Sequence, residues 1–429
     1  MSQAEGAPGA PSPPGAPGAR EITLEVVRRV LRGAFLAPTL RRSLDASRLD
    51  GRDRSFVTDL AYGTLRWLPW LEAALQPRLD PRRRLPERVA VALRVGAFEL
   101  LVRRTPPHAV VSAWVDVTKR RHGALAGLVN AVLRRLEAPM PTTPETRVAL
   151  PAWLLARFEV ALGVEDAERA ARAMLEPGPL WLRAYAEDAA AMLRAEGCEV
   201  QDGPLPATLR VRAPLPLDRL RAYREGRVQP QNPSSTLPAA LLAPAAGERC
   251  LDLAAGNGVK TAQLAAAGAV VTAVDIDARK ARAMDVNLAR LGLGAGHASA
   301  DLTAKAPLPP APCVLLDAPC SGSGTLRGHP EIKLRLRPAD VAAAASRQSA
   351  MLDTAVALTA PGGRLVYAVC SLTEAEGEGQ IAALLARRPD LRAESLTPDV
   401  PHVATPNGCY VLPLAGLDGF YLARLQRPA

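Results

Sequence analysis

Hydrophobic residues recur at helical spacing along the first third of the chain, from Ile22 to Leu136. Val89 and Leu93 belong to one such series, and prolines separate the apolar runs. Apolar positions spaced in this way indicate amphipathic helices. We therefore predict an all-helical bundle that ends near residue 140, where the proline-containing segment 138–144 is typical of a linker.

The rest of the chain carries two further patterns. Between residues 145 and 228, helical spacing mixes with short strand-like pieces, which predicts a small α+β insert. From residue 229 to 429, short apolar runs alternate with helical segments, and this alternation indicates a parallel, doubly wound α/β sheet. The expected strands are 250–254, 269–274, 297–300, 312–316 and 364–369, with helices near 261–267, 278–291, 338–358 and 373–386.

Composition excludes several classes of protein. A chain of 429 residues with 48% hydrophobic and 22% charged positions is unlike a disordered or fibrous protein, although residues 1–20, rich in Ala, Gly and Pro, are expected to be a disordered tail. No apolar run approaches the roughly 20 residues of a membrane span and no signal-peptide pattern is present, so we expect a cytoplasmic protein. The six cysteines form no CxxC pair, so we expect no metal and no disulfide framework.

Basic charge is concentrated in the predicted helical bundle. Residues 21–140 contain 22 basic and 12 acidic side chains, whereas residues 141–429 contain 30 of each. Within the basic part, Arg82, Arg83 and Arg84 form a run. Clustered arginines are typical of a surface that binds a phosphate backbone, although solvated helix faces can show the same composition.

Two glycines follow the predicted strand 250–254 and precede a helix, where the backbone can approach a ligand closely. A dinucleotide fingerprint needs a third glycine where Thr261 stands, and a phosphate-binding P-loop needs glycine where Val259 stands, so neither fits. The spacing acidic-x-x-x-Gly-x-Gly resembles the first motif of S-adenosylmethionine-dependent methyltransferases. That resemblance implies S-adenosyl-L-methionine as cofactor in a Rossmann-like domain. The cofactor-binding residues expected in the loop are Ala254, Ala255, Gly256, Asn257, Gly258, Val259 and Lys260.

Acidic residues after the next two strands support this prediction. Asp275 ends the second strand, where a carboxylate can accept hydrogen bonds from both ribose hydroxyls of an adenosine. Asp301 follows the third strand and has two interpretations. The methyltransferase resemblance implies a contact near the adenine amine, whereas the residue type alone fits a helix N-cap equally well. Asp277 is expected to be the N-cap of the helix 278–291.

Two cysteines are predicted to lie at the same edge of the sheet. Cys320 follows the strand 312–316 through an acid-Ala-Pro sequence that begins at Asp317, and Cys370 directly follows the strand 364–369. The carboxyl ends of parallel strands form the ligand-binding edge of such sheets. One cysteine there is usually part of the core, but two at neighbouring strand ends indicate chemistry.

The pair suits methylation of a pyrimidine ring. C5 of a pyrimidine is too weakly nucleophilic to take a methyl group until a thiolate adds to C6, so a cysteine nucleophile is needed. After transfer, the C5 proton must leave and the thioether must be eliminated, which a second group can assist. Asp317 is expected at N3 and the amino edge of the ring, where a carboxyl group stabilises the charge that thiolate attack develops.

These motifs resemble the RNA cytosine-C5 methyltransferase family that includes the bacterial Sun (RsmB-type) 16S ribosomal RNA enzymes. The resemblance covers about residues 20–425 and implies that Cys370 is the nucleophile, that Cys320 promotes product release, and that a monomeric enzyme acts on 16S ribosomal RNA. It rests on Asp317-Ala318-Pro319-Cys320-Ser321, His329-Pro330-Glu331-Ile332-Lys333, Tyr367-Ala368-Val369-Cys370-Ser371, the acidic Glu374, Glu376 and Glu378, and Asp418-Gly419-Phe420-Tyr421.

The first third of the chain is similar to the helical domain, related to the antitermination factor NusB, that precedes the catalytic core in the Sun subgroup. Segments 106–109 and 127–134 carry this similarity, which implies an RNA-binding domain over residues 21–140. Segment 228–235 is similar to the family motif that helps to line the site. His329 and Lys333 are further candidates for RNA contact, with local loop structure as the alternative.

The chain departs from the family pattern in the cofactor loop, which usually reads Cys-Ala-Ala-Pro-Gly-Gly-Lys. Ala254, Gly256, Asn257 and Val259 stand here for Cys, Ala, Pro and the second Gly, and the β-branched Val259 puts cofactor affinity in question. Two alternatives stay open. One is DNA cytosine-C5 methylation, in which the Pro-Cys cysteine is the nucleophile. The other is a non-catalytic RNA-binding ribosome-assembly factor that no longer binds the cofactor.

Overall fold

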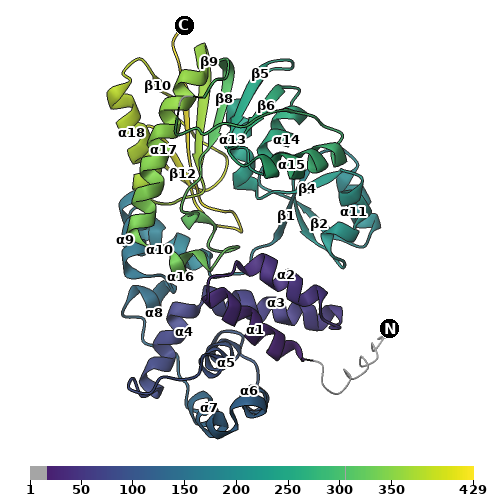
Figure 1. The fold of residues 1–429 in the computed structure, drawn as a ribbon, viewed down its shortest axis with the longest axis vertical. Helices are drawn as coiled ribbons and strands as arrows, with labels where there is room; N and C mark the ends of the chain where they lie inside the picture. The colour runs from purple at the N-terminus through teal and green to yellow at the C-terminus, as the bar shows by residue number, and fades with distance from the viewer. Residues whose placement is uncertain (1–16, 305) are drawn as a thin grey trace. The chain divides into compact units, whose positions relative to one another are not determined.

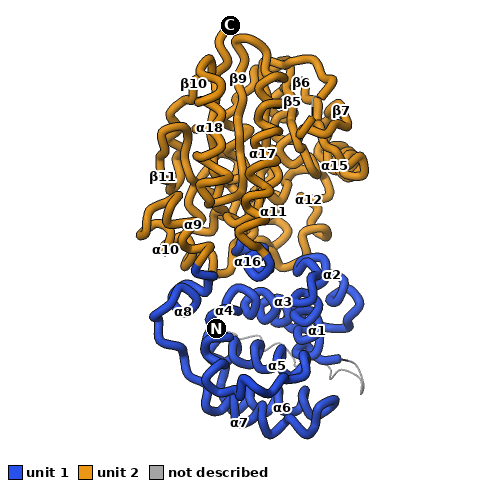
Figure 2. The backbone as a smooth tube through the Cα atoms, turned by 60° about the vertical axis from the view of Figure 1, so that its left-hand side comes forward, with its two compact units in different colours: residues 1–152, 326–335 blue, residues 153–325, 336–429 orange. Residues whose placement is uncertain are grey.

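The computed structural model describes residues 17–304 and 306–429. These residues form two compact units, one comprising the chain up to residue 152 with segment 326–335, the other comprising 153–325 with 336–429 (Figure 2). The predicted boundaries at 140, 145 and 229 differ from this division. The expected tail, residues 1–20, lies mostly outside the described residues, and the first helix, α1, begins at Ala19.

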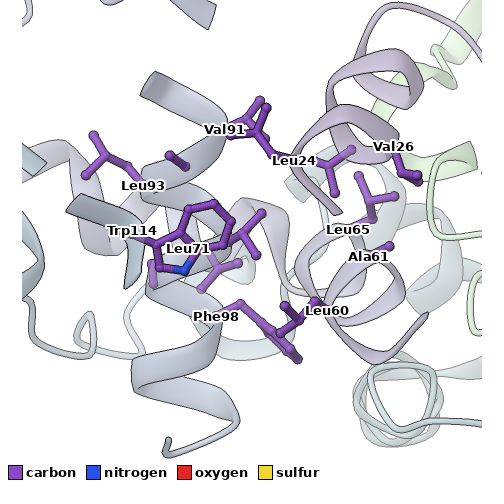
Figure 3. Close-up of a cluster of buried hydrophobic side chains, with 14 of the residues drawn as sticks. Leu24, Val26, Leu60, Ala61, Leu65, Leu71, Val91, Leu93, Phe98 and Trp114 are labelled. Carbon is purple, nitrogen blue, oxygen red and sulfur yellow. The ribbon is translucent and has the colours of Figure 1, made fainter. Parts of the chain in front are cut away.

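The first unit is all-helical, as the apolar spacing predicts. Its core gathers apolar side chains from several helices, and Leu71, Phe98 and Trp114 lie within one such cluster (Figure 3). Burial of these side chains stabilises a bundle of short helices that would be marginal in isolation. The helices are α1 (Ala19–Leu31), α2 (Leu36–Asp45), α3 (Gly51–Arg66), α4 (Leu68–Leu75), η1 (Gln76–Arg78), α5 (Glu87–Ala97), η2 (Phe98–Val102), α6 (Pro107–His122), η3 (Gly123–Leu125), α7 (Ala126–Arg134) and α8 (Pro144–Val148).

Segment 326–335 packs with this helical unit although it lies far along the chain (Figure 2). It contains the short helix α16 (Ile332–Arg335). Leu334 packs against the helical core, and the buried Glu331 accepts the backbone N–H of Leu36 at 3.0 Å. The chain therefore leaves the second unit five residues after Cys320 and returns to it at Leu336.

The second unit begins with helices and a small antiparallel sheet of order β2-β3-β1-β4. The predicted strand-like pieces are confirmed as β1 and β3, which pair with each other. The elements of this part are α9 (Ala152–Leu162), α10 (Val164–Ala173), β1 (Leu180–Ala184), α11 (Ala189–Ala195), β2 (Glu199–Asp202), β3 (Thr208–Arg212), η4 (Leu217–Arg219), α12 (Arg221–Arg224) and β4 (Val228–Pro230).

The larger sheet runs in the order β11-β12-β13-β9-β8-β5-β6-β7, with helices α17 and α18 beside it (Figure 1). The strands expected from the sequence, β5 to β9, pair in parallel. The elements are α13 (Pro233–Leu242), β5 (Arg249–Leu253), α14 (Val259–Ala266), β6 (Val270–Val274), α15 (Ala278–Arg290), β7 (Gly296–Ala298), β8 (Ala311–Asp317), η5 (Ser323–Thr325), α17 (Pro338–Leu358), β9 (Thr359–Val369), η6 (Glu374–Glu376), α18 (Glu378–Arg387), β10 (Arg392–Ala393), β11 (His402–Thr405), β12 (Gly408–Val411) and β13 (Phe420–Gln426).

The sheet is mixed rather than wholly parallel, because β13 pairs antiparallel with β9 and extends the sheet through β12 and β11. The parallel strands retain a doubly wound order in which the chain reverses direction across the sheet between β5 and β8. Ligands of such sheets bind at the carboxyl ends of the strands beside this reversal. Among the described residues, no helix is long and apolar enough to cross a membrane.

Candidate active site

The two cysteines predicted from neighbouring strand ends lie in contact. β8 and β9 pair in parallel with Asp317 opposite Ala368, and Cys320 and Cys370 follow their carboxyl ends. The two Sγ atoms are 3.3 Å apart. Both side chains are partly exposed. The remaining cysteines are buried, and they are Cys198, Cys250, Cys313 and Cys409.

The environment of Cys320 favours its neutral thiol. The hydrogen bond with Cys370, burial, and the negative charges of Cys370 and Glu376 together raise the pKa of Cys320 well above its ordinary value. Two thiolates at this separation would repel each other, so a negative charge on Cys370 favours a proton on Cys320.

Lys260 and Asp317 form an ion pair beside the cysteines. The Lys260 Nζ donates to Asp317 Oδ2 at 2.6 Å and to Ser235 Oγ at 3.3 Å. Burial alone would lower the pKa of Lys260, but the carboxylates of Asp317 and Asp252 raise it above its ordinary value. A negative charge on Cys370 acts in the same direction, so the ammonium and a Cys370 thiolate attract each other.

Helix α13 brings Ser235 to this ion pair. Asn232 is the N-cap of α13, and its side chain accepts the Ser234 N–H at 3.1 Å. Pro233 at the first helical position has the backbone angle that a helix start requires. Ser235 therefore stands in the first turn, which agrees with the expectation that segment 228–235 helps to line the site.

The glycine loop after β5 is held in a strained, ligand-accessible shape. Ala254, Gly256 and Gly258 have φ of 59°, 58° and 76°. A Cβ on Gly258 would stand 2.2 Å from Met284 Cγ, so only glycine fits there. Gly258 is the N-cap of α14, which begins at Val259. The helix start with its free N–H groups is suited to a carboxylate or another anionic group.

Asp275 joins the end of β6 to the glycine loop. Its Oδ2 accepts the Gly256 N–H at 2.9 Å, and its carboxylate lies 3.2 Å from Lys280 Nζ. Near the end of β5, the buried Asp252 accepts a hydrogen bond from Thr261 at one oxygen, while its Oδ1 has no partner among the described residues. Burial raises the pKa of Asp252 to about 7.

These residues fit an adenosine-type cofactor. The loop offers close backbone approach, a helix start and the acceptor carboxylate of Asp275, which is the donor and acceptor set that such a cofactor requires. Ala255 and Val259 are partly buried in the loop, and Asn257 is exposed.

The structure confirms the N-cap predicted at Asp277 but not the N-cap interpretation of Asp301. Asp277 is the N-cap of α15, as predicted, and accepts the Arg279 N–H. The N-cap interpretation of Asp301 is wrong, because no helix lies between β7 and β8 in the described part of the chain. The Asp301 carboxylate is exposed and accepts the Thr303 N–H and hydroxyl, and these hydrogen bonds lower its pKa.

The candidate RNA-binding residues lie in the first unit. Arg82, Arg83 and Arg84 are exposed in the loop between η1 and α5, and His329 is exposed in segment 326–335. Lys333 does not fit the expectation of an RNA contact. Lys333 is buried, and its Nζ donates hydrogen bonds to the carbonyl oxygen of Arg66 and, at 2.8 Å, to that of Ala149. These contacts agree with the alternative interpretation, a role in local structure.

The sequence interpretation missed the partners that position the site. Lys260 was expected to bind cofactor, yet its ammonium contacts Asp317 and lies 5.6 Å from the centre of the Phe420 ring. Glu376 was noted within an acidic stretch, yet it lies fully buried among hydroxyl groups beside the cysteines. One acid among the neighbouring Glu374 and Glu378 is a weak sequence signal for such a contact.

Comparison with known proteins supports the sequence resemblance. Residues 239–426 match the family model "16S rRNA methyltransferase RsmB/F", and residues 17–138 match the NusB family model. The ribosomal RNA small subunit methyltransferase B of Thermus thermophilus is 42% identical over 409 residues, which cover 95% of this chain and 97% of the relative.

Solved structures show the same fold. The crystal structure of PH0851 matches with a TM-score of 0.80 at 23% identity and covers 95% of this chain and 98% of its own. NSun6 from Pyrococcus horikoshii, solved with the S-adenosylmethionine analogue SFG, matches with a TM-score of 0.58 at 21% identity, covering 66% of this chain and 99% of its own.

These findings confirm the predicted NusB-like domain, the Rossmann-like methyltransferase domain and the cofactor S-adenosyl-L-methionine. They also favour ribosomal RNA over DNA as the substrate. The chain is an S-adenosylmethionine-dependent ribosomal RNA methyltransferase and belongs to the 16S rRNA methyltransferase RsmB/F family.

Proposed function

We propose that the enzyme transfers a methyl group to C5 of a cytosine in 16S ribosomal RNA through a covalent adduct between Cys370 and C6 of the base. The observation that carries this proposal is the 3.3 Å contact between the Sγ atoms of Cys320 and Cys370 at paired strand ends. A nucleophilic thiolate next to a neutral thiol is what C5 chemistry requires.

Cys370 is the nucleophile in this proposal. Its thiolate attacks C6, and the electron pair of the C5–C6 bond becomes available at C5 as an enamine. S-adenosylmethionine, when bound, supplies the methyl group that C5 accepts. The attraction between Lys260 and a negative charge on Cys370 supports this assignment, because it stabilises the attacking species.

Cys320 assists release. After transfer, the C5 proton must be removed and the C6–S bond must break, which frees Cys370 and restores the aromatic ring. A group beside Cys370 with a raised pKa suits this step, because its thiol can protonate the departing sulfur and its thiolate is basic enough to accept a proton.

Asp317 binds the edge of the base. Its side chain is 32% exposed, so one face of the carboxyl group remains accessible while Lys260 holds the other. Hydrogen bonding at N3 and the exocyclic amine would stabilise the charge that accumulates when Cys370 attacks. A target cytosine must leave its stack to reach this site, as in other enzymes that act on a base.

The remaining site residues bind either the cofactor or the RNA phosphates. The glycine loop from Ala254 to Lys260 holds the cofactor together with Asp275. The Asp275 carboxylate accepts hydrogen bonds from the ribose hydroxyls of the cofactor. Asp301 is proposed as a contact near the adenine amine. Arg82, Arg83 and Arg84, together with His329, provide phosphate contacts for the RNA, and their exposure supports this role.

Mapping of 5-methylcytosine tests the proposal. A 16S RNA transcript is incubated with the protein and S-adenosylmethionine and then mapped by bisulfite sequencing, with Cys370→Ala as the control. We expect methylation at a defined cytosine that is absent with Cys370→Ala. RNA binding without 5-methylcytosine, on transcript and on assembling subunits alike, would favour the non-catalytic assembly factor.

A further inference from the structure

A buried carboxylate lies directly behind the two cysteines. Glu376, at the end of η6, is fully buried. Its Oε1 accepts the Ser321 N–H at 2.7 Å and the Gln348 side-chain amide at 3.2 Å. Its Oε2 accepts the hydroxyls of Ser321, Ser371 and Thr373 at 2.5, 2.7 and 3.0 Å. All of these partners belong to the second unit.

The serines that reach Glu376 are the chain neighbours of the cysteines. Ser321 follows Cys320, and Ser371 follows Cys370, so one carboxylate receives a donor from each cysteine loop. The two serine hydroxyls are themselves 3.3 Å apart. The strands β8 and β9 end before these residues, and a backbone hydrogen bond from the Gly324 N–H to the Cys370 carbonyl at 3.0 Å links the two loops beyond the regular ladder.

We propose that Glu376 is a positioning residue that holds the two cysteine loops together and thereby keeps the Cys320 and Cys370 Sγ atoms in contact. This inference rests on the proposed function only for its effect on methyl transfer. The geometric part concerns the thiols alone and can be measured without RNA or cofactor.

The chemistry of a carboxylate explains why this residue type is required. An ionised carboxyl group accepts hydrogen bonds at both oxygens and donates none, which matches a site where every neighbour is a donor. A glutamine of the same size would direct its NH₂ group either at the Ser321 N–H and the Gln348 amide or at the three hydroxyls, so that one of these two sets of donors would lose its acceptor. Removing a charge from water costs free energy, so a buried carboxylate is retained only where its hydrogen bonds are satisfied.

Glu378 provides a matched control in the same acidic stretch. Its carboxylate accepts the Thr405 hydroxyl and the Asn407 amide at 2.5 Å, and the Tyr421 hydroxyl at 2.8 Å. These partners lie on or beside β11, β12 and β13, and none belongs to a cysteine loop. Glu378→Gln therefore removes a carboxylate of comparable structural importance without touching Ser321 or Ser371.

Disulfide trapping in the full-length protein tests the geometric role. Diamide oxidises two neighbouring thiols to a disulfide and is itself reduced to the hydrazine, so the loss of two titratable thiols reports the Cys320–Cys370 distance. We expect Glu376→Gln to form this disulfide about tenfold or more slowly than the native protein, and Glu378→Gln to form it at the native rate. Peptide mass analysis identifies the bridge, and Cys320→Ser gives the background.

Steady-state kinetics supply the second readout. Misplacing a nucleophile by about 1 Å can cost about 100-fold in rate, so Glu376→Gln should lower kcat by that order while KM for RNA and for S-adenosylmethionine stays within about twofold. If Glu376→Gln does not fold, Ser321→Ala and Ser371→Ala, which keep the carboxylate and remove one donor each, should show intermediate loss of trapping rate.

The outcomes separate the two proposals. Native trapping rates in Glu376→Gln, or in both serine variants, would overturn the positioning role, as would equal kcat losses in Glu376→Gln and Glu378→Gln that follow their loss of thermal stability. Failure of the native protein to methylate cytosine would overturn the proposed function, while slower trapping in Glu376→Gln would still support the positioning role.

Discussion

The Lys260 ammonium and the Asp317 carboxylate join the glycine loop to the end of β8, with 2.6 Å between Nζ and Oδ2. The exposed fractions of the two side chains are 10% and 32%, so the pair is screened from water on the Lys260 side. This contact places the positive charge beside Asp317 and within electrostatic reach of Cys370. In the proposed mechanism, Lys260 therefore acts at the cysteine pair as well as in the glycine loop.

Substitution of either partner should slow methyl transfer. Lys260→Met removes the charge that attracts the Cys370 thiolate, and Asp317→Asn removes the acid at the base edge, each lowering the single-turnover rate by about 100-fold or more. Because the two side chains contact each other, the double variant should lose less than the product of the single losses. Fully multiplicative losses would show that the two groups act independently.

Cofactor affinity should depend on Asp275 far more than on Asp301. Asp275→Ala removes an acceptor that also holds the Gly256 N–H, and we expect the dissociation constant of S-adenosylmethionine to rise about 10- to 100-fold. Asp301→Ala, at an exposed residue bonded to Thr303, serves as the comparison. Calorimetry measures both dissociation constants, and equal losses of affinity would contradict the larger role of Asp275. No binding to the native protein at millimolar cofactor would contradict its enzymatic assignment.

The sheet edge that holds the two cysteines was predictable because it follows from local pattern and topology. Strand-end positions of Asp317, Cys320 and Cys370 can be read from apolar runs, and parallel pairing brings them together. The antiparallel strand β13 was missed, since its apolar run from Phe420 to Ala423 is short and does not show which strand it pairs with. Its role in covering the sheet edge becomes visible only in the fold.

RNA affinity should depend on the exposed arginine run. Replacement of Arg82, Arg83 and Arg84 by alanine removes up to three phosphate contacts, so binding should weaken and the slope of log affinity against log salt should fall by about 2. Filter binding over a series of salt concentrations measures both. Lys333→Met, at a buried position, should leave the slope unchanged. An unaltered slope in the triple variant would exclude this loop from the RNA interface.

Lys333 shows why a charged residue in a motif need not face a ligand. Its neighbours in space, Arg66 and Ala149, are far from it in the sequence, so no local pattern could predict its burial. The Arg66 side chain meets the same segment through a hydrogen bond from Nε to the Arg327 carbonyl at 2.8 Å. Local spacing carries information about elements, but not about which distant segment fills a gap between them.

Burial of Lys333 gives stability a pH dependence. Burial and the charge of Arg66 lower the pKa of Lys333 from 10.5 to about 7 in the folded protein. At pH values between these two pKa values, Lys333 is protonated in the unfolded chain and neutral in the folded chain. The contribution of Lys333 to the free energy of unfolding therefore rises as pH increases from about 7 to about 10.

Comparison with Lys333→Met isolates this contribution. Across this pH window, the free energy of unfolding of the native protein should rise by at least about 1 kcal/mol more than that of Lys333→Met, because a one-unit pKa shift corresponds to about that energy. Denaturant titrations monitored by the fluorescence of Trp67, Trp70 and Trp114, which lie in the first unit, provide the measurement. Parallel pH profiles would show that Lys333 has the same pKa in both states.

Separate substitution of the two cysteines tests the central claim most directly. Native protein, Cys320→Ser and Cys370→Ser are each incubated with S-adenosylmethionine and a substrate RNA, and the covalent protein–RNA complex is quantified on denaturing gels. Cys370→Ser should form no complex, whereas Cys320→Ser should accumulate it, because release is slowed while attack is retained. A complex that survives in Cys370→Ser and is lost in Cys320→Ser would contradict the account and make Cys320 the nucleophile.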